Sequence, residues 1–244
     1  MRQGCDCGSQ FNERTRTPYN YIEYPTDVVA MAVYFYYRFK TSLDDVVELM
    51  ALRNIHLSHQ TVYNWAHRFG VELAKQFRKN RVGKAGLKWH MDATYIRVEG
   101  RWCYLYRAID KQGNLIDVYL SDKRDQTAAE NFFLQAEQTT GVTPDIITTD
   151  KEPALATAID EVFGNGSEHR TSKYLNNRME ANHCSTKGRI NVMRGFKDIF
   201  SALRFCTVFE EVRQFFRMDS RRSQDRGVIA SRIQSFFNAA KAIA

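Results

Sequence analysis

The sequence lacks any apolar run near the length of about 20 residues that a membrane-spanning helix needs, and its first twenty residues lack the apolar stretch of a signal peptide. We therefore expect a cytoplasmic protein without membrane contact. The five cysteines are scattered, and only Cys5 and Cys7 lie close together. No second pair is spaced to complete a zinc site, so the set is typical of free thiols in a reducing compartment. The sequence also has no phosphate-binding P-loop and no Ser/His/Asp set.

What the sequence does contain is enough apolar side chain for one good core and a small second domain, because 43% of the 244 residues are hydrophobic. The net charge of +7 is unevenly spread. Residues 1–87 and 165–244 are basic overall, whereas residues 88–164 are acidic. Basic ends around an acidic centre are typical of a protein whose ends hold a polyanion and whose middle holds a divalent metal. Many intracellular proteins are mildly basic, so charge alone does not decide the function.

Residues 21–79 carry the pattern of a small helical domain, which follows a polar segment, residues 1–20, that predicts a flexible tail. A helix start signal at Pro25-Thr26-Asp27 leads into an aromatic-rich stretch that predicts a buried helix. Two shorter helices are predicted next, one from Ser42 to Arg53 and one from Ser58 to near Phe69.

The two shorter helices and the turn between them predict a helix-turn-helix. The second helix presents groups that can hydrogen-bond bases and phosphates, which indicates a DNA-binding surface. The candidate DNA contacts are Gln60, Thr61, Asn64 and Arg68. The same pattern also fits an ordinary three-helix bundle with a polar surface.

After a linker at residues 80–87, residues 88–200 have the pattern of an α/β domain. Three antiparallel strands with short glycine-containing connections are followed by helix, strand, helix, strand and helix. This order predicts a mixed five-stranded, RNase H-like sheet flanked by helices. The strands are expected at Lys88–Val98, Trp102–Asp110, Asn114–Ser121, Asp145–Thr149 and Glu168–Ser172. Residues 201–244 are expected to form C-terminal helices that pack on the core or join subunits.

Three carboxylates occupy positions that suit one shared site. Asp92 lies in the first core strand, Asp150 follows the fourth, and Glu180 opens the next helix. Each has an ordinary explanation: a half-exposed strand position for Asp92, a turn or cap aspartate for Asp150, and a capping box begun by Asn177 for Glu180. The first and fourth strands are neighbours in such a sheet, however, and the helix crosses near them, so a common site is favoured.

Carboxylates gathered around a partly buried site repel each other and lose hydration, so they need cations. Hard oxygen ligands suit Mg²⁺ or Mn²⁺, and two such ions can activate a hydroxyl nucleophile and stabilise a leaving oxygen in phosphoryl transfer. The sequence therefore predicts Asp92, Asp150 and Glu180 as metal ligands and catalytic residues of a nuclease or polynucleotidyl transferase.

The helix that begins at Glu180 supplies further candidate DNA contacts. Lys187 follows Glu180 at i+7, on the same helical face, and is expected to hold a phosphate beside the site. His183 lies near that face, although a packed or solvated histidine is an equally good interpretation. Arg189 is the third candidate on this helix.

Together these residues resemble the DDE transposases of bacterial and archaeal insertion sequences, and most closely insertion sequence family six. The matching stretches are WHMDATYIRVEGRWCYLYRAID, TTDKEPA, and KYLNNRMEANHCSTKGRI with GFK after it, within a resemblance that covers residues 21–217. The resemblance implies a catalytic triad of Asp92, Asp150 and Glu180, with Lys187 as the downstream basic partner. It also implies recognition of short terminal inverted repeats and 3′-end strand transfer that forms cointegrates.

Two rival hypotheses remain beside this one. A transposase-derived DNA-binding protein with a silent core is disfavoured by the intact triad, and an RNase H-like nuclease acting on other nucleic acid is disfavoured by the N-terminal helical domain. The expected partners are double-stranded DNA, at the element ends and at the target, and a second copy of the chain in a homodimer or higher oligomer. The expected location is the prokaryotic cytoplasm, in association with the nucleoid.

Overall fold

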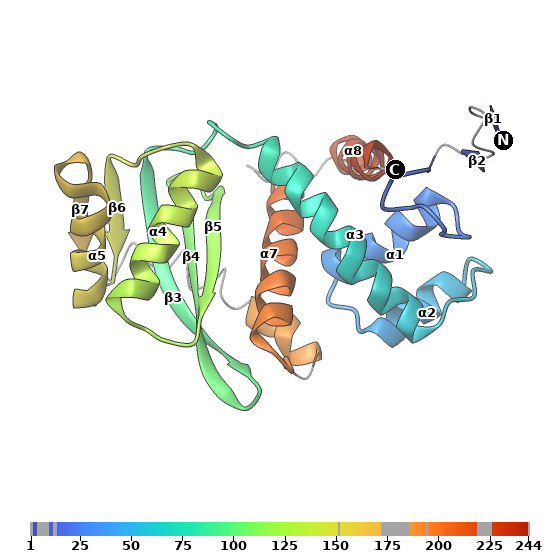
Figure 1. Cartoon of the computed structure of the whole chain (residues 1–244), viewed down its shortest axis with the longest axis horizontal. Helices are drawn as coiled ribbons and strands as arrows, with labels where there is room; N and C mark the ends of the chain where they lie inside the picture. The colour runs from blue at the N-terminus through green and yellow to red at the C-terminus, as the bar shows by residue number, and fades with distance from the viewer. Residues whose placement is uncertain are drawn as a thin grey trace. The chain divides into compact units, whose positions relative to one another are not determined.

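The computed structural model divides into two compact units (Figure 1). One unit consists of Met1–Gln76 and Met218–Ala244, and the other is Phe77–Arg217. Within the ranges that the structure describes, every helix is too short or too polar to reach across a lipid bilayer. Those ranges are residues 2–3, 10–11, 14–150, 152–171, 186–193, 195–218 and 226–243.

The first unit is helical. Its elements are α1 (Thr26–Arg38), α2 (Leu43–Ala51), the larger part of α3 (His59–Lys79), α8 (Arg226–Ala242), and a short antiparallel pair of β1 (Arg2–Gln3) and β2 (Gln10–Phe11). A capping box starts α2, because Ser42 Oγ accepts the Asp45 N–H at 3.0 Å and the Asp45 carboxylate accepts the Ser42 N–H at 2.7 Å. α1 packs against α8 through Tyr34 and Phe236, whose ring centroids are 5.4 Å apart.

The length of α3 corrects the sequence-based prediction, which ended this helix near Phe69. The helix continues to Lys79, and Gly70 lies inside it. A Cβ atom at Gly70 would stand 2.7 Å from Cε2 of Tyr37 on α1, and the Tyr37 hydroxyl donates to the carbonyl of Ala66 at 3.2 Å. The glycine therefore permits a close approach of α1 and α3 and does not end the helix.

Part of the segment expected to be a flexible tail is packed. Tyr19 is fully buried, and its ring stacks on Phe69 with centroids 4.2 Å apart. Arg14 holds the chain beside it by donating to the carbonyls of Ile22 at 3.0 Å and Tyr24 at 2.9 Å. The prediction of a flexible tail over residues 1–20 is therefore wrong for residues 14–20, because a buried aromatic side chain anchors them.

The second unit is built on a five-stranded sheet of order β5-β4-β3-β6-β7. β3, β4 and β5 are antiparallel neighbours, and β6 and β7 run parallel to β3 (Figure 1). This confirms the predicted α/β fold with a mixed, RNase H-like sheet flanked by helices. The elements are β3 (Lys88–Val98), β4 (Arg101–Asp110), β5 (Leu115–Ser121), α4 (Gln126–Thr140), β6 (Ile146–Thr149), α5 (Pro153–Phe163), η1 (Gly164–Gly166), β7 (Glu168–Thr171) and α7 (Ile199–Phe215). Residues 186–192 are also helical.

The buried side chains of β3 change from one face of the strand to the other near Asp92. Trp89 and Met91 are buried in the core cluster formed with α4 and α5. Beyond Asp92, the buried residues are Thr94, Ile96 and Val98, and they lie on the opposite face because side chains alternate along a strand. Asp92 itself is half-buried at this crossover, so its carboxylate is held on a rigid central strand without being sealed in the core.

Two neighbouring glutamates of α7 are buried and ion-paired within the second unit. Glu211 accepts hydrogen bonds from Arg78 at 2.9 Å and from Arg81 at 2.7 Å. Arg78 also pairs with the buried Asp117 of β5 at 2.5 Å. A buried charge is costly unless it is paired or well hydrogen-bonded, so these contacts determine how α7 packs on the residues around it.

Glu210 forms the second of these networks. Its carboxylate pairs with Arg107 of β4 at 3.0 Å and accepts the Thr186 hydroxyl at 2.7 Å. Burial raises the pKa of the Glu210 carboxyl, but the charges of Arg107 and Arg213 and the hydrogen bonds to the carboxylate together lower it below its ordinary value. Glu210 therefore stays ionised and links the helical segment at residues 186–192 to the sheet.

Glu210→Gln is expected to lower the free energy of unfolding by about 3–5 kcal/mol, because Arg107 would keep a buried charge without its counter-charge. Urea unfolding followed by circular dichroism measures this change. Glu168→Gln is the matched control, since Glu168 and its partner Arg170 are 56% and 52% exposed, and such pairs contribute little. Equal shifts in the two variants would contradict this account.

The advantage of the wild type over Glu210→Gln is expected to depend on pH. The pKa of Glu210 is lower in the folded than in the unfolded chain, so the stabilisation is fully present above the unfolded-state pKa of about 4.3. It is lost as the pH falls through the lower folded-state pKa. The stabilities of the two proteins, measured by urea unfolding, should therefore converge in acid, and a constant difference down to low pH would count against the ion pair.

Candidate active site

Asp92 lies on β3, and Asp150 directly follows the neighbouring strand β6. β6 pairs in parallel with the first part of β3, with His90 opposite Thr148. Asp150 stands two residues after Thr148, as Asp92 stands two residues after His90, so the register brings the two carboxylates to one level on strands about 4.8 Å apart. Both residues are half-buried. The sheet thus brings together two of the three carboxylates that the sequence predicts.

Arg124 and Glu152 lie beside Asp150, and the sequence analysis missed both. The Arg124 guanidinium contacts the Asp150 carboxylate at 3.2 Å and donates from Nε to Glu152 at 2.6 Å. The Glu152 N–H also donates to Asp150 Oδ1 at 3.2 Å. The signal for Glu152 was its place in TTDKEPA, two residues after Asp150. The signal for Arg124 was weaker, because no pattern in SDKRD shows that its side chain points toward a strand 26 residues away.

Asp92, Asp150, Glu152 and Arg124 form a cluster in which negative charge is in excess. Burial raises the pKa of the Glu152 carboxyl, and the negative charges of Asp150 and Asp92 act in the same direction, although Arg124 opposes them. Burial lowers the pKa of Arg124, but the charges of Glu152 and Asp150 outweigh it and leave this pKa raised. Positive charge therefore stabilises the carboxylates, and Arg124 supplies part of that charge.

Local structure holds Arg124 and Asp150 in place. Asp125 caps α4 by accepting the N–H of Ala128 at 2.9 Å, which fixes the backbone next to Arg124. Thr149 is fully buried, and its hydroxyl donates to the carbonyl of Asp150 at 2.8 Å. The same hydroxyl lies 2.8 Å from Nε2 of His169 on β7. Since the hydroxyl donates its proton to Asp150, the His169 ring donates to Thr149.

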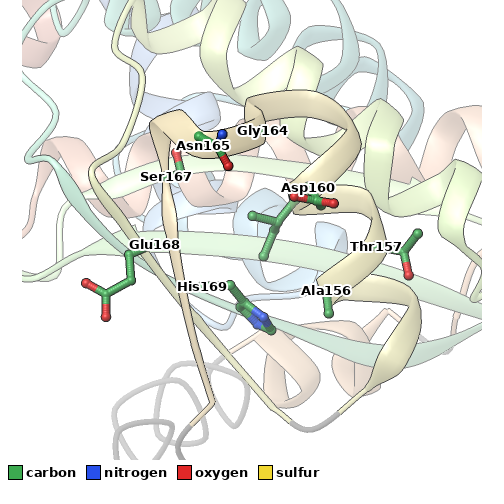
Figure 2. A pocket seen from close by; sticks show the side chains of 9 residues that line it. Ala156, Thr157, Asp160, Gly164, Asn165, Ser167, Glu168 and His169 are labelled. Carbon is green, nitrogen blue, oxygen red and sulfur yellow. The ribbon is translucent and has the colours of Figure 1, made fainter.

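A hollow of about 600 Å³ lies at the outer edge of the sheet, away from the carboxylates. It is lined by α5, η1 and β7, and Figure 2 shows His169 directed toward α5 and Glu168 directed away from it. Neither Asp92 nor Asp150 is among its lining residues. The cluster of Asp92, Asp150 and Glu152, and not this hollow, therefore defines the candidate active site.

The structure describes only some of the remaining residues of the predicted site. Glu180 and His183 lie outside the described residues, and among those that are described no set of three acidic, histidine or cysteine side chains is arranged to hold a metal. Lys187 lies with its Nζ atom 4.6 Å above the ring of Tyr95 on β3. Arg189 is fully buried and lies over the ring of Phe205, so it offers no surface to a phosphate and is left out of the DNA contacts proposed below.

The four candidate DNA contacts of α3 lie on its exposed or half-buried positions. Gln60 donates to the side chain of Asn64 at 2.8 Å, and Thr61 shares a hydrogen bond of 2.8 Å with Ser58 at the start of the helix. Arg68 is exposed, with its guanidinium 5.5 Å from the ring of Phe69. The helix therefore carries polar groups that can reach a ligand without uncovering the core.

Comparisons with known proteins agree with this geometry. A family model described as a DDE domain matches residues 86–219. The transposase of insertion sequence-like element IS431mec from Staphylococcus aureus strain N315 is 35% identical over 175 residues, which is 70% of this chain and 77% of the relative. The transposase of insertion sequence element IS257 in transposon Tn4003, also from Staphylococcus aureus, matches with the same identity and coverage.

Among solved structures, the HTLV-2 integrase catalytic core domain in complex with magnesium has a TM-score of 0.43 and 20% identity. The match covers 52% of this chain and 86% of the integrase chain. The family model spans both Asp92 and Asp150, and the bacterial relatives extend over most of the sequence. The chain therefore belongs to the DDE transposases of insertion sequence family six, which are enzymes that cut and join DNA.

Proposed function

We propose that Asp92, Asp150 and Glu180 form the catalytic triad and hold two Mg²⁺ or Mn²⁺ ions. The observation that supports this most is the parallel pairing of β3 with β6, which brings Asp92 and Asp150 to one level. The residues present fit divalent metal, because they offer hard carboxylate oxygens in a partly buried group that already draws in the Arg124 guanidinium. When bound, such ions lower the pKa of water or of a DNA 3′-hydroxyl and stabilise the leaving oxygen.

The reaction that we propose is cleavage at the 3′ ends of the element and transfer of those ends to target DNA, in the replicative manner that forms cointegrates. The terminal inverted repeats would be recognised by α3. A homodimer or higher oligomer would bring two ends together. The alternative of a catalytically silent DNA-binding protein gains no support from the comparisons, since the family match covers the catalytic domain.

Arg124 takes two roles in this proposal. Without metal, its guanidinium offsets part of the negative charge of Asp150 and Glu152. A divalent ion held by Asp150 would compete with that ion pair, because both cations are attracted to the same carboxylate. A displaced Arg124 guanidinium would remain beside these carboxylates, where it would bind a DNA phosphate, since a guanidinium binds phosphate well.

Asp92→Ala and Asp150→Ala are each expected to lower strand transfer by about a hundredfold or more, because metal stabilisation of transition-state charge contributes several kcal/mol. Strand-transfer assays with the element's own flanking ends measure this loss. Binding of those ends, measured by gel shift, should stay close to wild type. Asp160→Asn, which alters an exposed carboxylate of α5, is the control and should keep full activity. Strand transfer that survives either alanine variant would overturn the assignment.

Arg124→Gln is expected to tighten Mn²⁺ binding in the absence of DNA, because the cation that competes for Asp150 is gone, and yet to slow strand transfer. Isothermal titration and the metal-dependent rise in Tm measure the first effect. Lys123→Gln removes the same charge from the preceding exposed residue and should leave both quantities near wild type. Weaker metal binding in Arg124→Gln would show that Arg124 supports the metal site and does not compete with it.

The DNA-binding surface of α3 gives a separate test. Arg68→Ala is expected to weaken binding to all duplexes and to reduce the slope of log K against log salt by about one, as the loss of one phosphate contact requires. Asn64→Ala is expected to weaken binding to the terminal repeat more than binding to unrelated duplex. Fluorescence anisotropy at several salt concentrations measures both. Unchanged affinity and slope in both variants would contradict a helix-turn-helix that contacts DNA.

A further inference from the structure

Two large aromatic side chains on the β3–β4 hairpin are exposed and lie next to two cations. Tyr95 is 54% exposed and Trp102 is 56% exposed, and their rings meet edge to face with centroids 5.1 Å apart. The Arg97 guanidinium lies 5.8 Å from the Trp102 ring centroid, and Lys187 Nζ lies 4.6 Å from that of Tyr95. We call Tyr95, Arg97, Trp102 and Lys187 the aromatic–cation patch.

The patch is exposed because of the change of buried face along β3. The α4 and α5 helices cover the sheet around Trp89 and Met91, and Figure 1 shows the β3–β4 hairpin extending past these helices. Tyr95 and Arg97 lie on the same face as Met91 by strand alternation, but beyond the reach of the covering helices. Aromatic surface left in water on a rigid hairpin is typical of a binding site.

The chemistry of the patch selects a ligand with flat rings and negative charge. Exposed aromatic rings stack on nucleic acid bases, and adjacent Lys and Arg neutralise the phosphates between those bases. A cross-strand aromatic pair could serve only to stabilise the hairpin, but that role does not require two cations over the rings. A second copy of the patch is a poor partner, because each copy presents positive charge to the other.

The patch is close to the carboxylates in the chain. Tyr95 follows Asp92 by three positions along β3, a rise of about 10 Å, which corresponds to about three nucleotide steps of a DNA strand. The two side chains lie on opposite faces of β3. Because β6 pairs with β3 only as far as His90, the β6 ladder does not extend along the edge of β3 between Asp92 and Tyr95. Lys187, which follows the predicted Glu180 in the sequence, reaches Tyr95 from outside the hairpin.

We propose that the aromatic–cation patch binds an unpaired base, with its phosphates, next to the DNA 3′ end. The base stacks on Trp102, whose ring Tyr95 meets edge to face, and Arg97 and Lys187 bind the flanking phosphates. This inference rests on the proposed function, since it names a contact with the same substrate. It adds a preference for DNA ends that are unpaired over ends that are fully paired, and this preference needs no particular sequence because every base has a stacking face.

Tryptophan fluorescence tests the proposal directly. Of the three tryptophans in the sequence, Trp65 and Trp89 are 5% and 0% exposed, whereas Trp102 is exposed. The full-length protein is titrated, without divalent metal, with a mixed-sequence duplex that carries three unpaired thymidines at one 3′ end, and with the fully paired duplex of the same length. Stacking on Trp102 is expected to quench the emission with the unpaired end, and to a much smaller extent with the paired duplex. The quench should be absent in Trp102→Phe, which keeps a ring for stacking and so keeps the affinity.

Alanine variants test the contribution to binding. Trp102→Ala and Tyr95→Ala are each expected to weaken binding of the unpaired end about tenfold, measured by anisotropy, because stacking on one ring contributes on that scale. Binding of the paired duplex should change little. Phe200→Ala is the matched control, since Phe200 is an exposed aromatic residue of α7, 79% exposed and outside the patch, and it should bind both duplexes as the wild type does.

Three results would overturn the proposal. The first is emission that is unchanged by the unpaired end, and the second is wild-type affinity of Trp102→Ala for that end. The third is a loss of self-association in Trp102→Ala, seen by sedimentation with DNA binding unchanged, which would make the patch a contact between copies. Each of these assays uses metal-free protein and DNA of arbitrary sequence. A failed patch therefore leaves the strand-transfer test of Asp92 and Asp150 unaffected, and the reverse also holds.

Discussion

The two glutamates that α7 buries must each meet a cation, because a buried charge without a partner is costly, and this constraint determines how the second unit is assembled. Glu210 and Glu211 are adjacent on α7, and three of their arginine partners, Arg78, Arg81 and Arg107, come from positions 103 to 133 residues away in the chain. Apolar packing alone would accept α7 in several positions along the sheet, because hydrophobic contacts are not directional. The ion pairs allow only one position of α7, since any other position leaves a buried charge without a partner.

The same constraint operates at the candidate active site, but there it is incompletely satisfied. Asp150 and Glu152 share one arginine, and Asp92 adds its charge to theirs. On α7 the carboxylates are almost fully buried and matched by cations, whereas at the site they are partly open to water and in excess over the single arginine. The structural carboxylates of α7 and the carboxylates proposed to bind metal thus differ in this chain by burial and by the ratio of charges around them, not by residue type.

The sequence predicts those parts of the fold that depend on local patterns. Alternating side chains and short glycine-containing connections place β3, β4 and β5 to within a residue or so, and the helix expected from Ser42 to Arg53 corresponds to α2. The end of α3 was misplaced, because the helix continues through Gly70, whose role depends on Tyr37 of another helix. Arg124 and the partners of Glu211 are likewise invisible to local patterns, since their meaning depends on pairings over long separations. Of the predicted triad, the register of β3 and β6 accounts for Asp92 and Asp150, whereas Glu180 lies outside the described residues.

The aspartate cap at the start of α4 has a consequence for how this protein can diverge. Asp125 fixes the first turn of the helix, and β5 ends at Ser121. The connection that contains Arg124 is therefore short and is held at both ends. An insertion there would rotate the guanidinium away from Asp150, even though short surface loops usually tolerate added residues. Among related chains that retain the ion pair, the length of this connection should therefore be constant while its other side chains vary freely.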